Sequence, residues 1–494
     1  MGTDTASESP ESPVEPHPPD ALRWTDEHDP ENPFNWPATR RWGVVGLACY
    51  VTFIVGWNAT TVSGAAIEIG EYFGVSDQSF PNSFWPVTSW TTGAAVAPMI
   101  VLPIMEDFGV RPGYLISYFI FSIFVIPQAV ATNFATLLVT RFFAGCCAGI
   151  LQDGTDGIVA DLFPDPVRRS LPISCYVFSL LAGVTIGPVI GGAIKEHLYW
   201  RWIFYSQLCI YFGSFPMIFL IMKETRGPVI LLKRARRNAS NQQQGNISEL
   251  EKQQHHFSPV QFLKENVVRP GYMLVTEPVV FFFTLLTALS YGIVFVSSQS
   301  VTQVFMKLYG WPEHTTAYVQ AAIVVGEFLG LLICLYQNYL FERAFRPQSR
   351  TPKSRLPEVR LYMSIPGSFI GLAGGLFWYG WTSYRSLHWI LPTIGLTLTG
   401  IGSMVVMQAV MMYLTDAYAK YAASASAAAC AGENIFAAFL PLAAQSMYTN
   451  LGFQWASSVL AFIALGLSFA PIVLIFYGET IRKWSPFMSQ AAYE

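Results

Sequence analysis

The chain has 494 residues, of which 52% are hydrophobic, 15% aromatic and only 12% charged. An ordinary soluble globular protein carries about twice this share of charged residues, so the composition excludes that class and indicates a membrane protein. The net charge of −3 says little, because the distribution of the charges along the chain is uneven.

The N-terminal segment 1–42 is acidic, rich in proline and without an apolar core, which predicts a disordered cytosolic tail and no cleavable signal peptide. Beyond it, apolar runs of roughly 20 residues predict twelve membrane-spanning helices. We place them at 43–63, 83–103, 112–132, 135–158, 171–194, 201–222, 276–299, 316–337, 361–381, 388–412, 424–447 and 454–477.

The longest interruption, residues 223–275, divides these spans into two groups of six. We therefore expect an all-α integral membrane protein with an N-terminal six-helix bundle at 43–222, a cytosolic linker at 223–275, a C-terminal six-helix bundle at 276–477 and a cytosolic tail at 478–494. Lys and Arg collect in the segments that would be cytosolic: Arg168, Arg169, Lys223 to Arg269, Arg343 to Arg360, Arg482 and Lys483. This bias predicts that both termini are cytosolic.

All seven cysteines fall inside predicted spans, where they are expected to be small packing residues. We expect neither a metal site nor a cofactor. Asn58 begins a glycosylation sequon but lies within or near the first span, so its glycosylation is left open.

The loop after the second span contains Glu106, Gly109 and Arg111. Glu106 and Arg111 can pair with each other, or with Asp161 and Arg168 of the next inner loop, for roughly 0 to 1 kcal/mol if exposed. These residues form a candidate cytoplasmic latch. The alternative is that the charges only set the topology.

The fourth span carries Arg141 several residues inside the membrane, where an unpaired cation is costly. Asp153 and Asp156 follow on its cytosolic half. Fifteen residues at 100° each place Asp156 only about 60° around the helix from Arg141, so one stripe can hold both signs of charge. The alternative is that the two aspartates only reach interfacial water.

The fifth span contains GVTIGPVIGG, with Gly183, Gly187, Pro188, Gly191 and Gly192. Glycines four residues apart let another helix approach closely, and a proline bends the helix. The pattern fits a close-packing helix of any multi-span protein. It also resembles a motif of one particular family.

That pattern, together with the loop after span 2, resembles the major facilitator superfamily, and further motifs resemble its fungal twelve-span drug:proton antiporter branch. The further motifs are DPENPFNWP, ADLFPDPVRRS, KETRGPVILLKR, TEPVVFF, FWYGWTS, YLTDAY and NLGFQWASSVLAFIAL, which cover residues from 29 nearly to the end. The resemblance implies that the loop is a cytoplasmic latch, that Arg141 takes part in proton transfer and that the glycine-rich helix limits leak. The latch is incomplete, because Leu102 and Val110 replace a glycine and a basic residue of the family pattern.

Two carboxylates of the C-terminal half depart from the family pattern. Glu327 lies about 11 residues into span 8, roughly 16 Å deep at 1.5 Å per residue, and Glu433 lies in span 11 where relatives carry arginine. A carboxylate at mid-membrane depth is a functional candidate, here for carrying a proton. The alternative is a structural pair with Arg141 or a hydrogen-bond network. Trp57, Tyr291, Phe377, Trp378 and Tyr379 are candidates for an apolar cavity lining.

We therefore expect a monomeric transporter in the plasma membrane bilayer that exports a small organic molecule in exchange for protons. The alternatives are a proton-coupled uptake permease for a polyamine or nutrient and a non-transporting membrane sensor. Because the enzyme motifs H-E-x-x-H and G-x-S-x-G and the ATP-binding loop are all missing from the sequence, we expect neither an enzyme nor an ATP-driven pump. No nucleic-acid partner is expected.

Overall fold

The computed structural model describes residues 24–26, 28–75, 82–242, 264–346, 352 and 355–491, without the side chains of 238–242. Every regular element within these residues is a helix. The first half of the chain forms η2 (Pro33–Asn35), α1 (Ala38–Thr61), η3 (Val62–Ala65), α2 (Ala66–Phe73), η4 (Asn82–Phe84), α3 (Trp85–Phe108), α4 (Val110–Ala129), α5 (Phe134–Leu162), α6 (Pro166–His197), α7 (Trp202–Ile221) and α8 (Gly227–Gln242).

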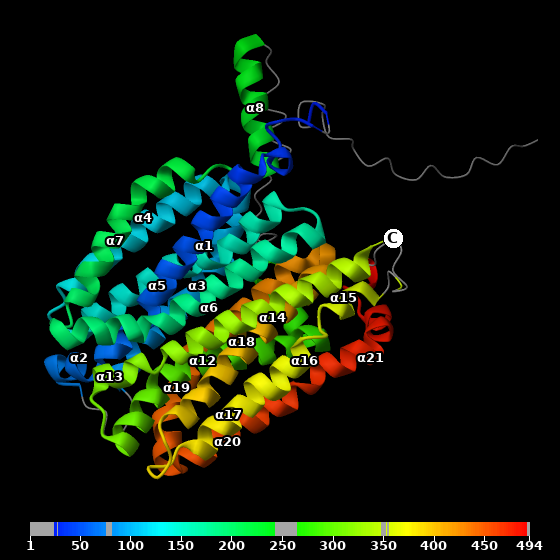
Figure 1. The fold of residues 1–494 in the computed structure, drawn as a ribbon. Helices are drawn as coiled ribbons and strands as arrows, with labels where there is room; N and C mark the ends of the chain where they lie inside the picture. The colour runs from blue at the N-terminus through cyan, green and yellow to red at the C-terminus, as the bar shows by residue number, and fades with distance from the viewer. Residues whose placement is uncertain are drawn as a thin grey trace, which may run out of the picture.

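The second half forms η5 (Lys264–Val268), α11 (Arg269–Thr276), α12 (Pro278–Tyr309), α13 (Glu313–Tyr318), α14 (Ala321–Phe345), α15 (Leu356–Val359), α16 (Ser364–Pro366), η7 (Gly367–Gly374), α17 (Gly375–Thr382), α18 (Ile390–Tyr418), η8 (Ala419–Tyr421), α19 (Ala422–Asn450), α20 (Gly452–Leu467), α21 (Phe469–Trp484) and η9 (Ser489–Ala491). Figure 1 shows the long helices of both halves running side by side, while α8 projects from one end of the molecule.

Local signals in the sequence explain where the long helices begin and end. The Asp165 side chain accepts a hydrogen bond from the Val167 backbone N–H, and Pro166 occupies the first position of α6. Asn133 caps α5 in the same way through the Thr136 N–H. Gly109 separates α3 from α4 with a φ of 114°, a conformation that residues with a side chain rarely adopt.

Ten helical segments among the described residues are long and apolar enough to cross a membrane. One of them, Ile390–Asn450, contains both α18 and α19, which were predicted as separate spans. The predicted span 361–381 falls on α16, η7 and α17, where a glycine-rich π-helix interrupts the regular helix. The number of twelve spans and the orientation of the termini stay predictions.

The two halves meet along two pairs of helices. Helix α6 packs against α14, and α3 packs against α19. Most of the buried apolar side chains of the first half form one cluster that includes a few residues of the second, and most of those of the second half form another. In Figure 1 the blue-to-teal helices accordingly lie beside the yellow-to-red ones, with α6, α12 and α14 between them.

The N-terminal segment contacts the first helix of the linker. The Asp29 carboxylate accepts a 2.6 Å hydrogen bond from Arg234 of α8, and Arg237 lies 3.1 Å from Glu31. Since α1 begins at Ala38 and residues 28–37 include η2, the tail that was predicted to be disordered over 1–42 becomes structured earlier. Residues 1–23 of that prediction lie outside the described part of the chain. Helix α8 likewise occupies part of the predicted linker.

Candidate transport site

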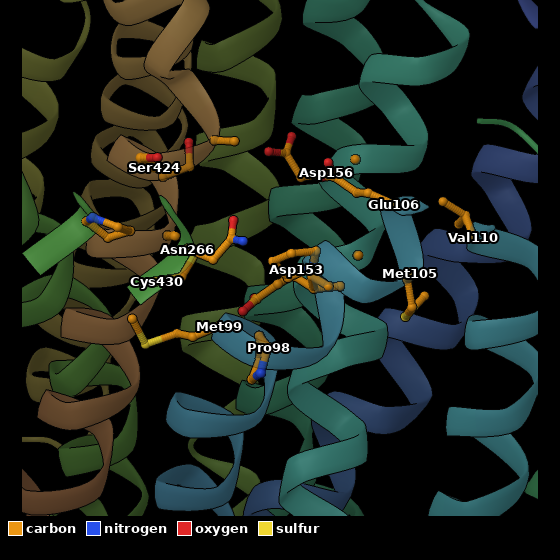
Figure 2. Close-up of a pocket in the computed structure, with 18 of the residues that line it drawn as sticks. Pro98, Met99, Met105, Glu106, Val110, Asp153, Asp156, Asn266, Ser424 and Cys430 are labelled. Carbon is orange, nitrogen blue, oxygen red and sulfur yellow. The ribbon is translucent and has the colours of Figure 1, made fainter. Parts of the chain in front are cut away.

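A cavity of about 470 Å³ lies between the two halves. Helices α3, α5 and α6 line one side, α18 and α19 line the other, and η5 with the start of α11 contributes residues at its end. Figure 2 shows Asp153 and Asp156 on α5 facing the space that separates them from Ser424 and Cys430 on α19, with Asn266 of η5 between. The cavity reaches Glu106 and Arg226, in segments that the charge bias assigns to the cytosol.

Two of the predicted carboxylates line this cavity, and a third, Glu433, lies near it without being one of its lining residues. Asp153 and Asp156 line it from α5, and Asp153 interacts electrostatically with Glu433 of α19 as well as with Asp156. Thr287 of α12 lies near Glu433, but its hydroxyl donates to the Phe283 carbonyl at 3.2 Å. Within the described residues, none of the three carboxylates forms an ion pair. The cavity therefore brings negative charge from both halves close together.

Arg141 lies away from these carboxylates, in a cage of backbone carbonyls. Its side chain is fully buried, with Nε 2.9 Å from the Pro86 carbonyl and NH1 2.8 Å from that of Asn58. A further bond reaches the carbonyl of Ala59. Arg141 thus joins α5 to α1 and α3. No ion pair between Arg141 and an acidic residue is present in the described part of the chain, so the alternative of a structural pair with Glu327 or Glu433 is not what the structure shows.

Glu327 occupies a different place from Glu433. It is fully buried where α14 meets α6, and its Oε1 accepts a 2.6 Å hydrogen bond from the Thr185 hydroxyl. Its Oε2 is buried and has no hydrogen-bond partner among the described residues. Glu327 does not line the cavity. The sequence placed Glu327 inside an apolar span but gave no sign that its neighbour would be Thr185, within the glycine-rich motif.

The glycines of that motif are required by close contact. A Cβ on Gly187 would lie 2.1 Å from the Thr60 Oγ1, and one on Gly191 would lie 2.1 Å from the Thr61 carbonyl oxygen, both on α1. A Cβ on Gly183 would likewise lie 2.6 Å from the Phe53 carbonyl oxygen. Gly192 instead faces Ala317 of α13, in the other half. Pro188 lies within the continuous helix α6. The motif therefore packs α6 against α1 and, at one end, against the C-terminal half.

The predicted latch residues form a different network from the one expected. Arg226, just after α7, lies 2.7 Å from Glu106 and 3.2 Å from Asp161, and so joins α3 to α5. Arg111 instead donates to the Phe219 carbonyl, and Arg168 lies 3.8 Å from Asp165. The predicted pairing of Glu106 and Asp161 with Arg111 and Arg168 is thus wrong. The cation comes from KETR, a motif whose charge could have suggested this role.

Glu224 of the same motif organises the α3–α4 turn. Its carboxylate accepts hydrogen bonds from the backbone N–H groups of Val110 at 3.0 Å and Arg111 at 3.2 Å. A Cβ on Gly109 would lie 2.6 Å from the Glu224 Oε2, so the glycine is needed for this approach. The segment after α7 therefore contacts both the α3–α4 turn, through Glu224, and the end of α5, through Arg226.

Two groups of charges connect the halves at opposite ends. Asp416 of α18 lies 2.8 Å from Arg360 and 3.2 Å from Arg169 of α6, and Arg360 also donates to the Ser170 hydroxyl. At the other end, Lys195 of α6 pairs with Glu313 of α13. The sequence analysis missed the pairing around Asp416, although Asp416 belongs to the YLTDAY motif.

The aromatic residues proposed for the cavity lining do not line it. Trp57 donates to the Tyr211 hydroxyl. Tyr291 and Tyr379 are buried elsewhere, Phe377 is half-buried and Trp378 is exposed, and none of them is a lining residue of this cavity. The described residues include no group of three or more His, Cys, Asp or Glu that could hold a metal ion.

Comparisons with known proteins agree with this architecture. The family model of the Major Facilitator Superfamily matches residues 48–432. The chain is 32% identical over 465 residues to the "MFS transporter cpaT" of Aspergillus oryzae, which covers 93% of this chain and 91% of that protein. It is 30% identical over 487 residues to the "Efflux pump radE" of Floropilus chiversii, covering 98% and 88%.

Solved structures share the fold at low sequence identity. The proton:xylose symporter XylE superposes with a TM-score of 0.64 at 16% identity, over 90% of this chain and 96% of that one. The human organic anion transporter MFSD10 does so with a TM-score of 0.57 at 15% identity, over 88% and 100%. The expected all-α membrane fold is confirmed, and the chain belongs to the major facilitator superfamily, whose members are membrane transporters and not enzymes.

Proposed function

We propose that this protein is a monomeric proton antiporter of the plasma membrane that exports a small organic molecule, such as a drug, a toxin, a polyamine or a secondary metabolite. Residues 43–222 and 276–477 act as its two halves and 223–275 as their cytosolic linker. The name "Efflux pump" of the Floropilus chiversii relative supports export over uptake. The antiporter-like motif on α6 supports the exchange with protons.

The observation that carries the proposal is the position of Asp153 on the wall of a cavity between the halves, with Glu433 of the other half as its electrostatic neighbour. Neither carboxylate has an ion-pair partner in the described part of the chain. Ionisable groups inside a membrane protein are costly and commonly mark ion or proton pathways. Since one carboxylate comes from each half, a movement of the halves changes the environment of both.

In the proposed cycle, substrate enters the cavity from the cytosolic side while a carboxylate releases its proton there. The halves then rock, and protonation from the outside displaces the substrate. Glu433 is the first candidate carrier near the cavity. Glu327 is the second candidate. Its Oε2 is buried without a hydrogen-bond partner among the described residues, so this oxygen can accept a proton without losing a hydrogen bond.

Arg141 enters this mechanism as a fixed positive charge. Its three carbonyl partners hold it between α1, α3 and α5, so it acts on the carboxylates over a distance rather than through an ion pair. Arg226 keeps Glu106 and Asp161 together as the latch on the cytosolic side of the N-terminal half.

Transport by the full-length protein in liposomes with an imposed pH gradient tests the proposal. A panel of cationic, neutral and anionic compounds identifies a transported one, and Glu327→Gln and Glu433→Gln are then compared with the wild type. We expect each substitution to reduce gradient-driven flux at least about tenfold, which is 1.4 kcal/mol. Glu342→Gln is the control, since Glu342 is exposed and lies in a surface ion pair with Arg346.

Unimpaired coupling in both variants would remove Glu327 and Glu433 from the mechanism. Flux in liposomes of known orientation distinguishes export from uptake. If the flux of the transported compound does not depend on the pH gradient, proton antiport is overturned.

A further inference from the structure

We propose that the cavity between the halves binds an organic cation, with the charged nitrogen at Asp153 and within the field of the neighbouring Glu433, and the body of the molecule against Tyr176. This rests on the proposed transport function and names the chemical class of its substrate. Some of the charges of the lining are already neutralised inside the protein and others are not.

Six acidic residues line the cavity: Glu106, Asp107, Asp153, Asp156, Asp161 and Glu265. Two pairs of them differ in their counter-ions. Glu106 and Asp161 at the cytosolic end share Arg226 as their counter-ion. Asp153 and Asp156, one helical turn apart on α5, form no ion pair or hydrogen bond within the described residues. Arg269, the other lining cation, donates to the Ser424 hydroxyl at 2.8 Å rather than to a carboxylate. Arg169 acts electrostatically on Asp156, whereas no cation among the described residues does so on Asp153. Asp153 therefore lacks a counter-ion of its own.

Tyr176 provides an independent sign of a ligand. It lines the cavity from α6 with only 2% of its surface exposed, and its hydroxyl has no hydrogen-bond partner in the described part of the chain. A tyrosine buried to this degree is ordinarily hydrogen-bonded. It interacts electrostatically with Asp153, Asp156 and Glu433, so its hydroxyl and ring lie beside the same charges. An aromatic ring next to carboxylates is a common arrangement for holding an ammonium group.

The remaining walls suit the body of such a molecule. Met99 and Met411 face the cavity with Pro98 and Cys430, and Figure 2 shows Met99 and Pro98 below Asp153. Methionine side chains are flexible and polarisable, so they adapt to ligands of different shape. A volume of about 470 Å³ falls within the range of small-molecule sites. The size and lining of the cavity therefore suit a drug-sized molecule, and the carboxylates favour one with a positive charge.

The test measures equilibrium binding to the purified full-length protein at pH 7.5, without a gradient. The probes are three flat molecules of similar size: 9-aminoacridine, which is cationic at this pH, acridine, which is neutral, and acridine-9-carboxylate, which is anionic. We expect 9-aminoacridine to bind at least about tenfold more tightly than acridine, and the anion to bind most weakly. Fluorescence anisotropy of each probe gives the dissociation constants.

Variants assign the selectivity to the named side chains. Asp153→Asn and Glu433→Gln should each reduce the affinity for 9-aminoacridine at least about tenfold and leave that for acridine unchanged, while Asp153→Glu should retain the preference. Tyr176→Phe keeps the ring and should weaken cation binding about threefold. Glu342→Gln, which removes an exposed carboxylate outside the cavity, should change nothing. If Asp153→Asn fails to fold, Glu433→Gln and Tyr176→Phe decide the matter in the same assay.

A wild-type protein that binds the three probes equally, or the anion best, overturns the proposal. The proposal is also overturned if the carboxylate variants lose affinity for all three probes equally, because that result indicates a structural role. Failure here leaves proton antiport intact if gradient-driven flux still depends on Glu433. Conversely, cation-selective binding without proton-coupled flux would keep this site and remove the antiport mechanism.

Discussion

The hydroxyl of Thr185 donates a 2.6 Å hydrogen bond to the carboxylate of Glu327, across the interface between α6 and α14. Thr185 lies within the glycine-rich motif, and Glu327 is a fully buried carboxylate of the other half. Two features that lie 142 positions apart in the sequence are therefore in direct contact. Any movement of the halves that separates α6 from α14 must break this bond and change the surroundings of a buried carboxylate.

A double-mutant cycle measures this contact. Thr185→Val removes the donor and leaves Glu327 buried, so we expect a loss of roughly 1 to 3 kcal/mol in the free energy of unfolding. In the background of Glu327→Leu, which removes the carboxylate, the same Thr185→Val change should cost much less. Thermal unfolding of the detergent-solubilised proteins gives the coupling, for which residues in contact commonly show 0.5 to 3 kcal/mol. Strict additivity would show that the bond contributes nothing.

Glycine at position 191 should be needed for packing rather than for flexibility. A Cβ there would lie 2.1 Å from a backbone oxygen of Thr61, so Gly191→Ala must push α6 and α1 apart. Overpacking of this kind costs roughly 1 to 3 kcal/mol. Gly46→Ala on α1 is the matched control, because its Cβ would meet nothing within 4 Å and alanine favours the helix. Expression and thermal unfolding of both variants are compared, and equal behaviour of the two would contradict the packing role.

The sequence predicted the parts of the fold that depend on composition along the chain. Most apolar runs became long helices, the glycines of α6 met another helix, and Glu327 was found buried. These outcomes follow from hydropathy and side-chain size, which are local properties. The interruption at η7 was missed, since the four glycines of residues 367–375 weaken a helix without changing its hydropathy.

The pairing of charges could not be predicted in the same way. Glu106 was expected to bind Arg111, five residues away, but it binds Arg226, which is 120 positions away. A residue's partner depends on how the helices are arranged in three dimensions, and one sequence does not specify this. The same reason applies to Asp416, whose arginine partners come from α6 and from the segment after α15. The cavity lining was mispredicted for the aromatic residues because the direction of each side chain depends on that arrangement.

Asp416→Asn should be strongly destabilising. It removes the carboxylate that contacts both Arg169 and Arg360, and Arg360 is 1% exposed. Breaking a buried ion pair from one side costs about 3 to 5 kcal/mol, whereas an exposed pair contributes about 0 to 1 kcal/mol. The matched change Glu342→Gln, at the exposed pair with Arg346, should therefore leave the melting temperature nearly unchanged. Similar melting temperatures for the two variants would count against a structural role for Asp416.

Docking of the N-terminal segment on α8 should be insensitive to pH in the physiological range. The hydrogen bond from Arg234 is the main cause that lowers the pKa of Asp29 from 3.8 to about 2. A lowered folded-state pKa means that the contact stabilises docking fully above about pH 4 and that this contribution is lost as the pH falls toward 2. Hydrogen exchange of residues 28–37, corrected for the intrinsic rate, should show equal protection at pH 5 and pH 7. Asp29→Asn should lose that protection at both values, and a wild-type protein that loses protection between pH 7 and pH 5 would contradict this assignment.

Closure at the end of α6 can be tested by a reversible crosslink. Gly192 faces the other half so closely that its Cβ would lie 2.8 Å from the Ala317 Cβ, somewhat nearer than the 3.5 to 4.5 Å of a disulfide. Gly192→Cys combined with Ala317→Cys should therefore form a disulfide after a small shift of α13. If alternating access separates these helices, oxidation should reduce transport in liposomes at least about tenfold and a reductant should restore it. Gly192→Cys alone is the control for crowding, since its effect does not depend on oxidation. Full transport by the oxidised double variant, with the disulfide verified by mass spectrometry, would show that this end of α6 stays closed throughout the cycle.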